Sequence, residues 1–204
     1  MMFQSDDLQE ALGDSLRRAM VVGVVGPAGG RLVEVYGNYV CVGSDVFLRA
    51  QFREAISPAA DRFLEIRCQE EARTFVEDNM LMISCDELGR RLNAWDSYLA
   101  GTPSHPLQTE AQVRRDTYLQ VLLRGMDNWP VFIHEGVQPP RLSSHVKTCY
   151  EGFLANYPTS TSAGTVRAYY AVLSRARFRQ TPQVAAFLDS VGIGTTDGVE
   201  ISGW

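Results

Sequence analysis

The sequence has few lysines and histidines and no closely spaced cysteine pair, and these shortages bear on metal and cofactor sites. The 204 residues include 19 cationic side chains, of which Lys147 is the only lysine. The four cysteines form no CxxC motif, and the three histidines are far apart in the sequence. Structural zinc sites need four ligands, usually in such short-spaced pairs. The sequence therefore predicts no metal and no other cofactor.

Long apolar segments are also absent. The longest apolar run covers residues 19–25, well short of the roughly 20 residues that span a bilayer. No basic segment followed by an apolar run begins the sequence, so we predict no signal peptide. We expect a cytoplasmic or virion-interior protein that is not secreted and has no membrane contact. In such a compartment the cysteines are expected to be buried, reduced thiols: Cys41, Cys68, Cys85 and Cys149.

Negative charge is missing from one long stretch of an otherwise acidic chain. The net charge is −5, which argues against a surface that coats nucleic acid generally. Residues 141–180 nevertheless carry six cations against Glu151 alone, a net of +5, which leaves −10 for the remaining residues. No acidic residue occurs between Glu151 and Asp189. The local charge thus has the opposite sign to the average.

The residues that are present predict a single domain of the mainly α (α+β) class. With 45% hydrophobic and 21% charged residues, the composition is that of an ordinary folded domain. We expect a small N-terminal antiparallel β-meander over about 20–43, a multi-helix bundle over about 44–190, and an extended tail over 191–204. The meander has three strand candidates separated by glycine-rich turns, at residues 20–25, 31–36 and 39–42.

Capping residues mark the expected helices. A first helix is expected over residues 6–20, and Ser44 or Asp45 can cap a helix that ends near residue 56. Ser57 and Pro58 then begin a helical pattern that continues to about residue 82. Ser84 and Glu87 match the capping box, and an apolar seam follows at Leu88, Leu92, Trp95 and Leu99.

The second half of the chain shows similar signals. A second capping box at residues 109–112 predicts a helix over residues 110–124. The prolines of residues 125–142 predict a long connection without helix. Ser143 or Ser144 precedes a helix to about residue 156, and Thr181 with Pro182 begins a last short helix that ends at residue 190.

Three segments suggest enzymatic or ligand sites but lack part of the required chemistry. The glycine-rich residues 23–31 contain no lysine and lead into a strand, whereas a P-loop needs GxxxxGK[ST] before a helix. His145 and Cys149 share a face of one predicted helix, but no second ligand pair accompanies them. Cys149 with His134 or His105 has no local signature of nucleophilic catalysis. An uncharacterised Cys/His enzyme therefore stays an alternative, and we predict a non-enzymatic protein.

One predicted helix, residues 165–179, combines arginines with aromatic rings. At 100° per residue its apolar side chains form one stripe, made of Val166, Tyr169, Val172, Leu173 and Ala176. The opposite arc carries the candidate binding residues, which are Arg167, Arg175 and Arg179, with Arg177 toward the edge and Phe178 among them.

Arginine beside aromatic rings is typical of proteins that hold a nucleic-acid backbone and stack on bases. The other interpretation is a surface helix whose arginines pair with acidic residues of the same chain or of a neighbour. We predict a structural subunit that self-associates into a larger assembly, of the viral or phage capsid, tail or nucleocapsid type. Its basic helix is expected to face RNA, DNA or an acidic neighbour. A small regulatory or adaptor protein that binds an acidic partner is the alternative.

Overall fold

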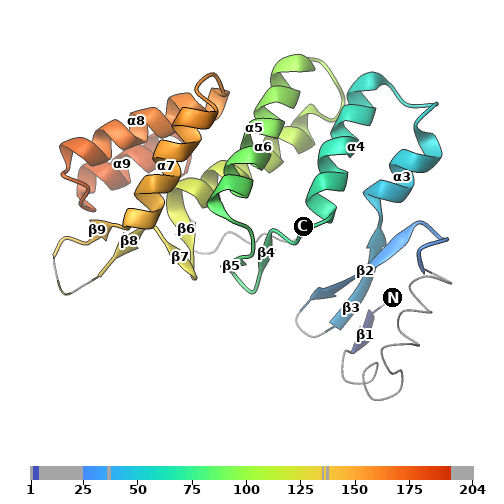
Figure 1. The fold of residues 1–204 in the computed structure, drawn as a ribbon, viewed down its shortest axis with the longest axis horizontal. Coiled ribbons are helices and arrows are strands. Elements are labelled where there is room, and N and C mark those ends of the chain that lie inside the picture. The colour runs from blue at the N-terminus through green and yellow to red at the C-terminus, as the bar shows by residue number, and fades with distance from the viewer. Residues whose placement is uncertain (1, 5–24, 36–37, 135, 137, 194–204) are drawn as a thin grey trace. The chain divides into compact units, whose positions relative to one another are not determined.

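The computed structural model describes residues 2–4, 25–35, 38–134, 136 and 138–193. Its helices and short antiparallel strands confirm the predicted mainly α (α+β) class (Figure 1). The chain divides into two compact units, Met1–Arg73 and Thr74–Trp204, and each is treated by itself below. The helix predicted over residues 6–20, nearly all of the strand predicted at 20–25 and the tail from residue 194 fall outside the described residues.

The first unit contains a three-stranded antiparallel sheet. Strands β2 (Gly30–Val35) and β3 (Asn38–Gly43) form the predicted hairpin, and β1 (Met2–Gln4) pairs with the other edge of β3. Gly29, which precedes β2, has a φ of 79°, and a Cβ placed there would lie 2.6 Å from the Phe47 ring. This turn therefore needs glycine for both its conformation and its space.

Two capped helices complete the first unit, α3 (Asp45–Phe52) and α4 (Pro58–Glu71). The side chains of Ser44 and Ser57 accept hydrogen bonds from the third backbone amides of these helices, as the sequence predicts. The prediction that the second helix continues to residue 82 is wrong.

A hairpin replaces the expected end of that long helix and opens the second unit. Strands β4 (Val76–Glu77) and β5 (Met80–Leu81) pair antiparallel. Asp78 and Asn79 join them with φ values of 47° and 58°. Asp and Asn tolerate this left-handed conformation better than most residues, and a pair of them makes a two-residue hairpin turn. The turn therefore interrupts a pattern that periodicity alone assigns to helix.

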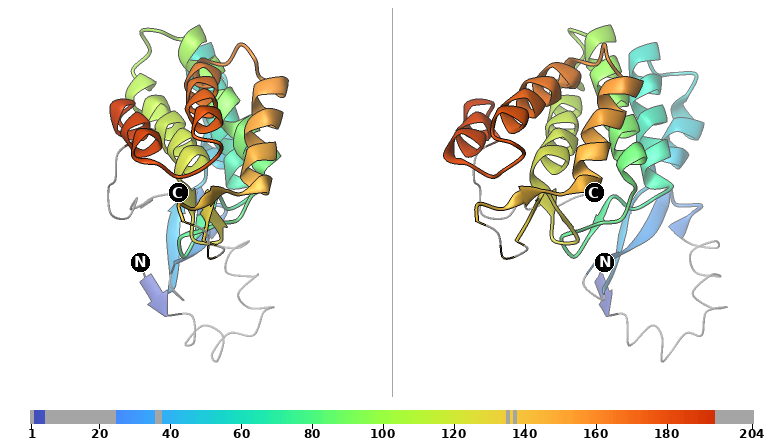
Figure 2. Two further views of the ribbon diagram at one scale, coloured as in Figure 1. Left: turned by 90° about the vertical axis from the view of Figure 1, so that its left-hand side faces the viewer. Right: turned by 60° about the vertical axis from the view of Figure 1, so that its left-hand side comes forward.

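The second unit is built from α5 (Cys85–Gly101), α6 (Gln108–Arg124), α7 (Ser144–Asn156), α8 (Thr161–Arg175) and α9 (Pro182–Ser190). Helix α5 packs against α6, α7 and α8, and α8 packs against α9. Short hairpins lie together at one end of these helices (Figure 1, Figure 2). The core consists of large side chains removed from solvent, including Leu88, Leu92, Trp95, Tyr118, Leu122, Val146, Tyr150, Val166, Tyr169 and Leu173.

The predicted connection over residues 125–142 contains two hairpins. Strands β6 (Gly125–Met126) and β7 (Trp129–Pro130) form one, and β8 (Phe132–Ile133) and β9 (Arg141–Leu142) form the other. The sequence predicts a connection without helix here, but not these strands. Proline excludes helix from this region, but it is compatible with such short edge strands.

Helix α6 corrects a second expectation from the sequence. It begins at Gln108 after Leu107, which makes no side-chain capping bond, so the capping box at residues 109–112 is wrong. The side chain of Gln108 instead donates hydrogen bonds to the carbonyl oxygens of Leu99 and Thr102, at 3.3 and 2.7 Å. This amide ties the start of α6 to the end of α5, a contact that a local capping pattern does not predict.

Candidate anion-binding surface

Helix α8 holds the candidate site, and its N-terminus is fixed by a carboxylate from another helix. The helix begins at Thr161, not at residue 165 as predicted, and its own cap Ser160 makes no local capping bond. Asp96 of α5, only 4% exposed, accepts hydrogen bonds from the Ser162 amide at 2.8 Å, from the Ser162 hydroxyl at 3.1 Å and from the Ser160 hydroxyl. Because Asp96 is 66 residues from Ser162 in the sequence, no local pattern reveals this cap.

The inner face of α8 agrees with the predicted apolar stripe. Val166, Tyr169 and Leu173 are fully buried, whereas Val172 and Ala176 at its margin are half-buried. The Tyr169 ring stacks on Phe187 of α9, with centroids 5.6 Å apart, and its edge meets Tyr150 of α7. Burial raises the pKa of both tyrosine hydroxyls. This half of the helix is core, and a ligand in solvent does not reach it.

The C-terminal end of α8 has an unusual backbone. The helix ends at Arg175, so the prediction that it continues to residue 179 is wrong. The Phe178 amide donates to the Leu173 carbonyl at 2.7 Å and the Arg177 amide to the Ser174 carbonyl at 3.0 Å. This pair of bonds is a Schellman motif, which usually has glycine where Arg177 stands. Arg177 and Phe178 have φ values of 53° and 56°, a conformation that costs a non-glycine residue about 1–2 kcal/mol.

After this turn the chain runs beside the β8–β9 hairpin. Leu142 donates its amide to the Phe178 carbonyl at 2.8 Å, and Gln180 donates to the Pro140 carbonyl at 2.8 Å. Arg141 and Arg179 thereby face one another as an antiparallel bridge. Like charges placed directly opposite each other repel, so this pairing concentrates positive charge at one place. Arg141 was not among the predicted binding residues, since the bridge joins segments distant in sequence.

The aromatic rings of this region are engaged within the protein. The edge of the half-buried Phe178 ring meets Tyr170, with centroids 5.6 Å apart, and the Lys147 ammonium lies 4.7 Å from the Phe178 centroid. The Tyr170 hydroxyl donates to Glu151 at 2.5 Å. Burial, and then the Glu151 carboxylate, raise the pKa of Tyr170 to about 12. Glu151 also lies 3.7 Å from Lys147, so this acidic residue interacts with α7 and α8 side chains.

The predicted arginines separate into two places. Arg167 is exposed on the N-terminal half of α8, where it donates to the Pro158 carbonyl at 3.3 Å. The other three lie within residues 175–179 at and after the C-terminal end of the helix, where Arg179 faces Arg141 through the backbone bridge. We call these four residues the basic surface: Arg141, Arg175, Arg177 and Arg179.

The basic surface is exposed and lacks an internal counter-charge among the described residues. Arg141, Arg175 and Arg177 are exposed, and Arg179 is half-buried with its guanidinium donating to the Pro139 carbonyl at 3.2 Å. None of the four forms an ion pair with a described carboxylate. Glu135, in the β8–β9 loop, lies outside the described residues. Each exposed guanidinium group of this surface can donate paired hydrogen bonds to an anionic ligand.

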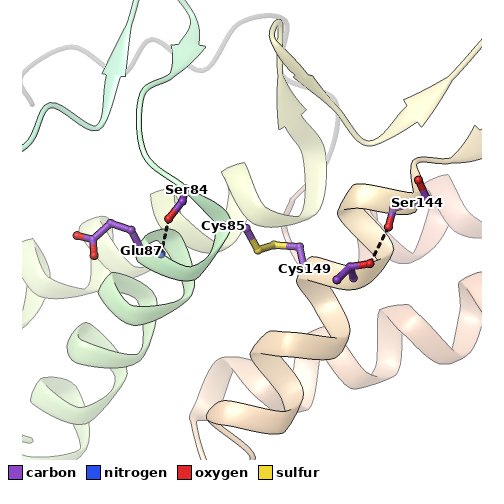
Figure 3. Close-up of a disulfide and its surroundings, with 6 residues drawn as sticks. Ser84, Cys85, Glu87, Ser144 and Cys149 are labelled. Carbon is purple, nitrogen blue, oxygen red and sulfur yellow. Dashed lines mark hydrogen bonds between the residues drawn. A yellow bond between two sulfur atoms is a disulfide. The ribbon is translucent and has the colours of Figure 1, made fainter.

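The residues considered for metal binding and catalysis are placed differently. Cys149 forms a disulfide with Cys85, with Cα atoms 5.8 Å apart, so the expectation of reduced thiols is wrong for this pair (Figure 3). His134 and His145 are exposed, and His105 Nδ1 lies 3.2 Å from the Tyr98 hydroxyl. In the described part of the chain, no three His, Cys, Asp or Glu side chains are grouped to hold a metal.

The remaining cysteines belong to the first unit. Cys41 is unpaired and exposed, which contradicts the expectation of a buried thiol, and Cys68 is unpaired and half-buried. Burial raises the pKa of the Cys68 thiol.

Comparison of the chain with protein-family models, with curated proteins and with solved structures finds no match. In the described ranges, no helix combines the length and the apolar character needed to cross a membrane.

Proposed function

We propose that the protein is a non-enzymatic assembly subunit that binds the phosphate backbone of nucleic acid through its basic surface. The observation that carries this proposal is that three arginines lie within residues 175–179, a fourth joins them through the Arg141–Arg179 bridge, and none of the four forms an ion pair with a described carboxylate. Guanidinium groups present paired donors that match phosphate oxygens, and they keep their charge at every physiological pH. A surface built this way gains most from a polyanion, because several contacts form along one chain of phosphates.

The rings next to the surface argue for backbone contact without base stacking. The Phe178 ring contacts both the Tyr170 ring and the Lys147 ammonium, so it is not free to stack on a base. Recognition of single strands by stacking needs open aromatic faces. The proposed contacts are therefore electrostatic, and they carry no sequence information of their own.

Surface composition favours nucleic acid over an acidic protein neighbour. Protein interfaces usually have an apolar centre within a polar rim. The large apolar side chains that are exposed in the described residues lie elsewhere than on α8 or the β8–β9 hairpin: they are Val46, Leu48, Phe52, Met80, Met82, Val113 and Val191. A small adaptor would bind an acidic protein through the same electrostatic contacts, but its interface would lack the apolar centre that protein interfaces usually have.

The assembly role is proposed because a single copy is expected to bind nucleic acid weakly and without sequence preference. Several copies on one polyanion bind more tightly than one, because each later contact is effectively intramolecular. This is the behaviour expected of a capsid, tail or nucleocapsid type of subunit, viral or phage. Light scattering with and without a long nucleic acid should show particles that contain many copies, and a monomer in both samples would contradict this role.

The binding itself is tested by fluorescence anisotropy with a labelled oligonucleotide, as a single strand and as a duplex, over a salt series. Four phosphate contacts predict a slope of log affinity against log salt of about −3.6 for the duplex and about −2.8 for the single strand. Two unrelated sequences should give equal affinity. Absence of binding at about 50 mM salt would overturn the proposal. Binding of poly-glutamate with no binding of nucleic acid would establish the adaptor instead.

A further inference from the structure

The disulfide joins two helices at sites with very different access to solvent. Cys85 is the first residue of α5 and is half-buried, whereas Cys149, in the middle of α7, is only 4% exposed. The two are 64 residues apart in the sequence. Figure 3 shows the bond crossing from the N-terminal turn of α5, where Ser84 accepts from the Glu87 amide, to α7. Helix α7 is thus held to α5 by one covalent link.

We propose that this disulfide is a reversible redox lock on α7. A low-molecular-weight thiolate reaches the sulfur of Cys85, forms a mixed disulfide there, and expels Cys149 as a thiolate that takes up a proton. A second thiol then attacks the mixed disulfide, which releases Cys85 as a thiol and the two reductant molecules as their own disulfide. Two electrons and two protons enter the protein, and the reductant is oxidised by the same amount.

Reversibility is supported by the other two cysteines. Cys41 is exposed and Cys68 is half-buried, and both are unpaired in the same chain. Exposed free thiols are a liability in oxidising compartments, because they form cross-links between molecules. A chain with both free thiols and one disulfide fits a reducing compartment, where disulfides are commonly transient and sense the redox state.

The lock acts on the helix that supports the basic surface. Cys149 belongs to the same helix as two residues that contact α8 and the turn after it. The Lys147 ammonium contacts the Phe178 ring, and the Glu151 carboxylate accepts a hydrogen bond from Tyr170. The first contact packs α7 against Phe178, which follows Arg177 in the turn, and the second packs α7 against α8. The hydrogen bonds from Ser160 and Ser162 to Asp96 do not involve α7, so we expect α8 to stay attached to α5 when the disulfide opens. Reduction is therefore expected to loosen α7 and the turn at Arg177 without unfolding the unit.

Hydrogen–deuterium exchange of the full chain, oxidised and then reduced with dithiothreitol, tests the lock. Reduction of the wild-type protein should remove protection from α7 and from residues 177–181. Cys85→Ser should exchange like the reduced protein under both conditions, and Cys41→Ser, the matched control, should behave like the wild type.

Thiol alkylation and mass measurement in glutathione buffers should show the Cys85–Cys149 pair changing between disulfide and dithiol while the protein stays folded. Equal exchange of α7 in both states would overturn the proposal, as would a bond that never forms or that opens only on unfolding.

The effect on the basic surface rests on the proposed function and is measured separately. The oxidised protein should bind the labelled duplex more tightly than the reduced protein. If neither state binds nucleic acid while exchange of α7 still changes, the proposed function fails and the lock stands. If both states bind equally while exchange changes, the lock stands and its control of the surface is wrong.

Discussion

Arginine has opposite surroundings in two regions of the second unit. In α5 and α6, Arg91 and Arg114 are buried, and each is within 2.7–2.8 Å of a carboxylate, that of Glu87 or Glu110. At the end of α8, Arg175 and Arg177 are exposed and pair with no described carboxylate. A buried charge needs a partner of opposite charge, because removing an unpaired charge from water costs several kcal/mol of folding free energy. An exposed arginine needs no such partner within the chain. An arginine that contributes to stability is therefore distinguished from one that is available to bind a ligand by whether a carboxylate of the chain lies beside it, more than by the number of arginines.

The first prediction removes the most deeply buried carboxylate of α5. Asp96→Ala leaves the Ser160 hydroxyl and both Ser162 donors without their acceptor, so unfolding in urea should show a loss of about 3 kcal/mol. The control is Asp116→Ala on α6, whose exposed carboxylate pairs with Arg115 at 3.1 Å and should contribute less than about 1 kcal/mol. Similar losses in the two variants would mean that burial does not distinguish these charges.

The second prediction tests the ion pair of Arg91. Glu87→Gln keeps the shape of the side chain but removes the carboxylate charge that lies 2.7 Å from this buried guanidinium, and should cost about 2 kcal/mol at neutral pH. Hydrogen bonds from Arg90, and then from Arg91, lower the pKa of Glu87 from 4.5 to about 2.

A lowered pKa in the folded state stabilises the protein fully above 4.5, and this contribution is lost as the pH falls toward 2. The melting temperature of the wild type should therefore fall as the pH is lowered over that range, and the fall should be smaller for Glu87→Gln. Parallel pH profiles for the two proteins would contradict the assignment.

The third prediction concerns the strained turn after α8. Arg177→Gly relieves a left-handed backbone and should stabilise the protein by about 1 kcal/mol in urea unfolding, while it weakens nucleic-acid binding. Arg175→Gly places glycine in the last turn of the helix and removes a cation there, and should instead destabilise by about 1 kcal/mol. If Arg177→Gly weakened both stability and binding, Arg177 would be a structural residue.

The sequence predicts those elements whose signals are local. Ser57, Ser84 and Ser143 do precede helices, and the last helix begins at Pro182 and ends at Ser190 as expected. Capping and apolar periodicity act within a few residues, so they can be recognised without the fold. The inner stripe of α8 is likewise correct at Val166, Tyr169 and Leu173.

The features that were missed depend on distant residues or on strain. Asp96 caps α8 from another helix, which explains why the start at Thr161 was not predicted. The end of α8 has arginine and phenylalanine where glycine is expected, so no residue type marks it. Arg141 joins the basic surface through a bridge to Arg179, and only the charge imbalance of residues 141–180 indicated that region. Strands of two residues are too short to show periodicity.

Nucleic-acid binding by two double variants, one of unpaired and one of paired arginines, tests whether the basic surface is the binding site. Arg175→Gln with Arg177→Gln removes two charges of the basic surface. The matched control, Arg62→Gln with Arg90→Gln, removes two exposed charges whose side chains are 52% and 41% exposed and are paired at 2.6 and 2.7 Å. Both doubles change the net charge equally. By anisotropy over a salt series, the first should bind about tenfold or more weakly with a duplex slope shallower by about 2, and the control should match the wild type. Equal losses in both doubles, or no loss in either, would contradict the account.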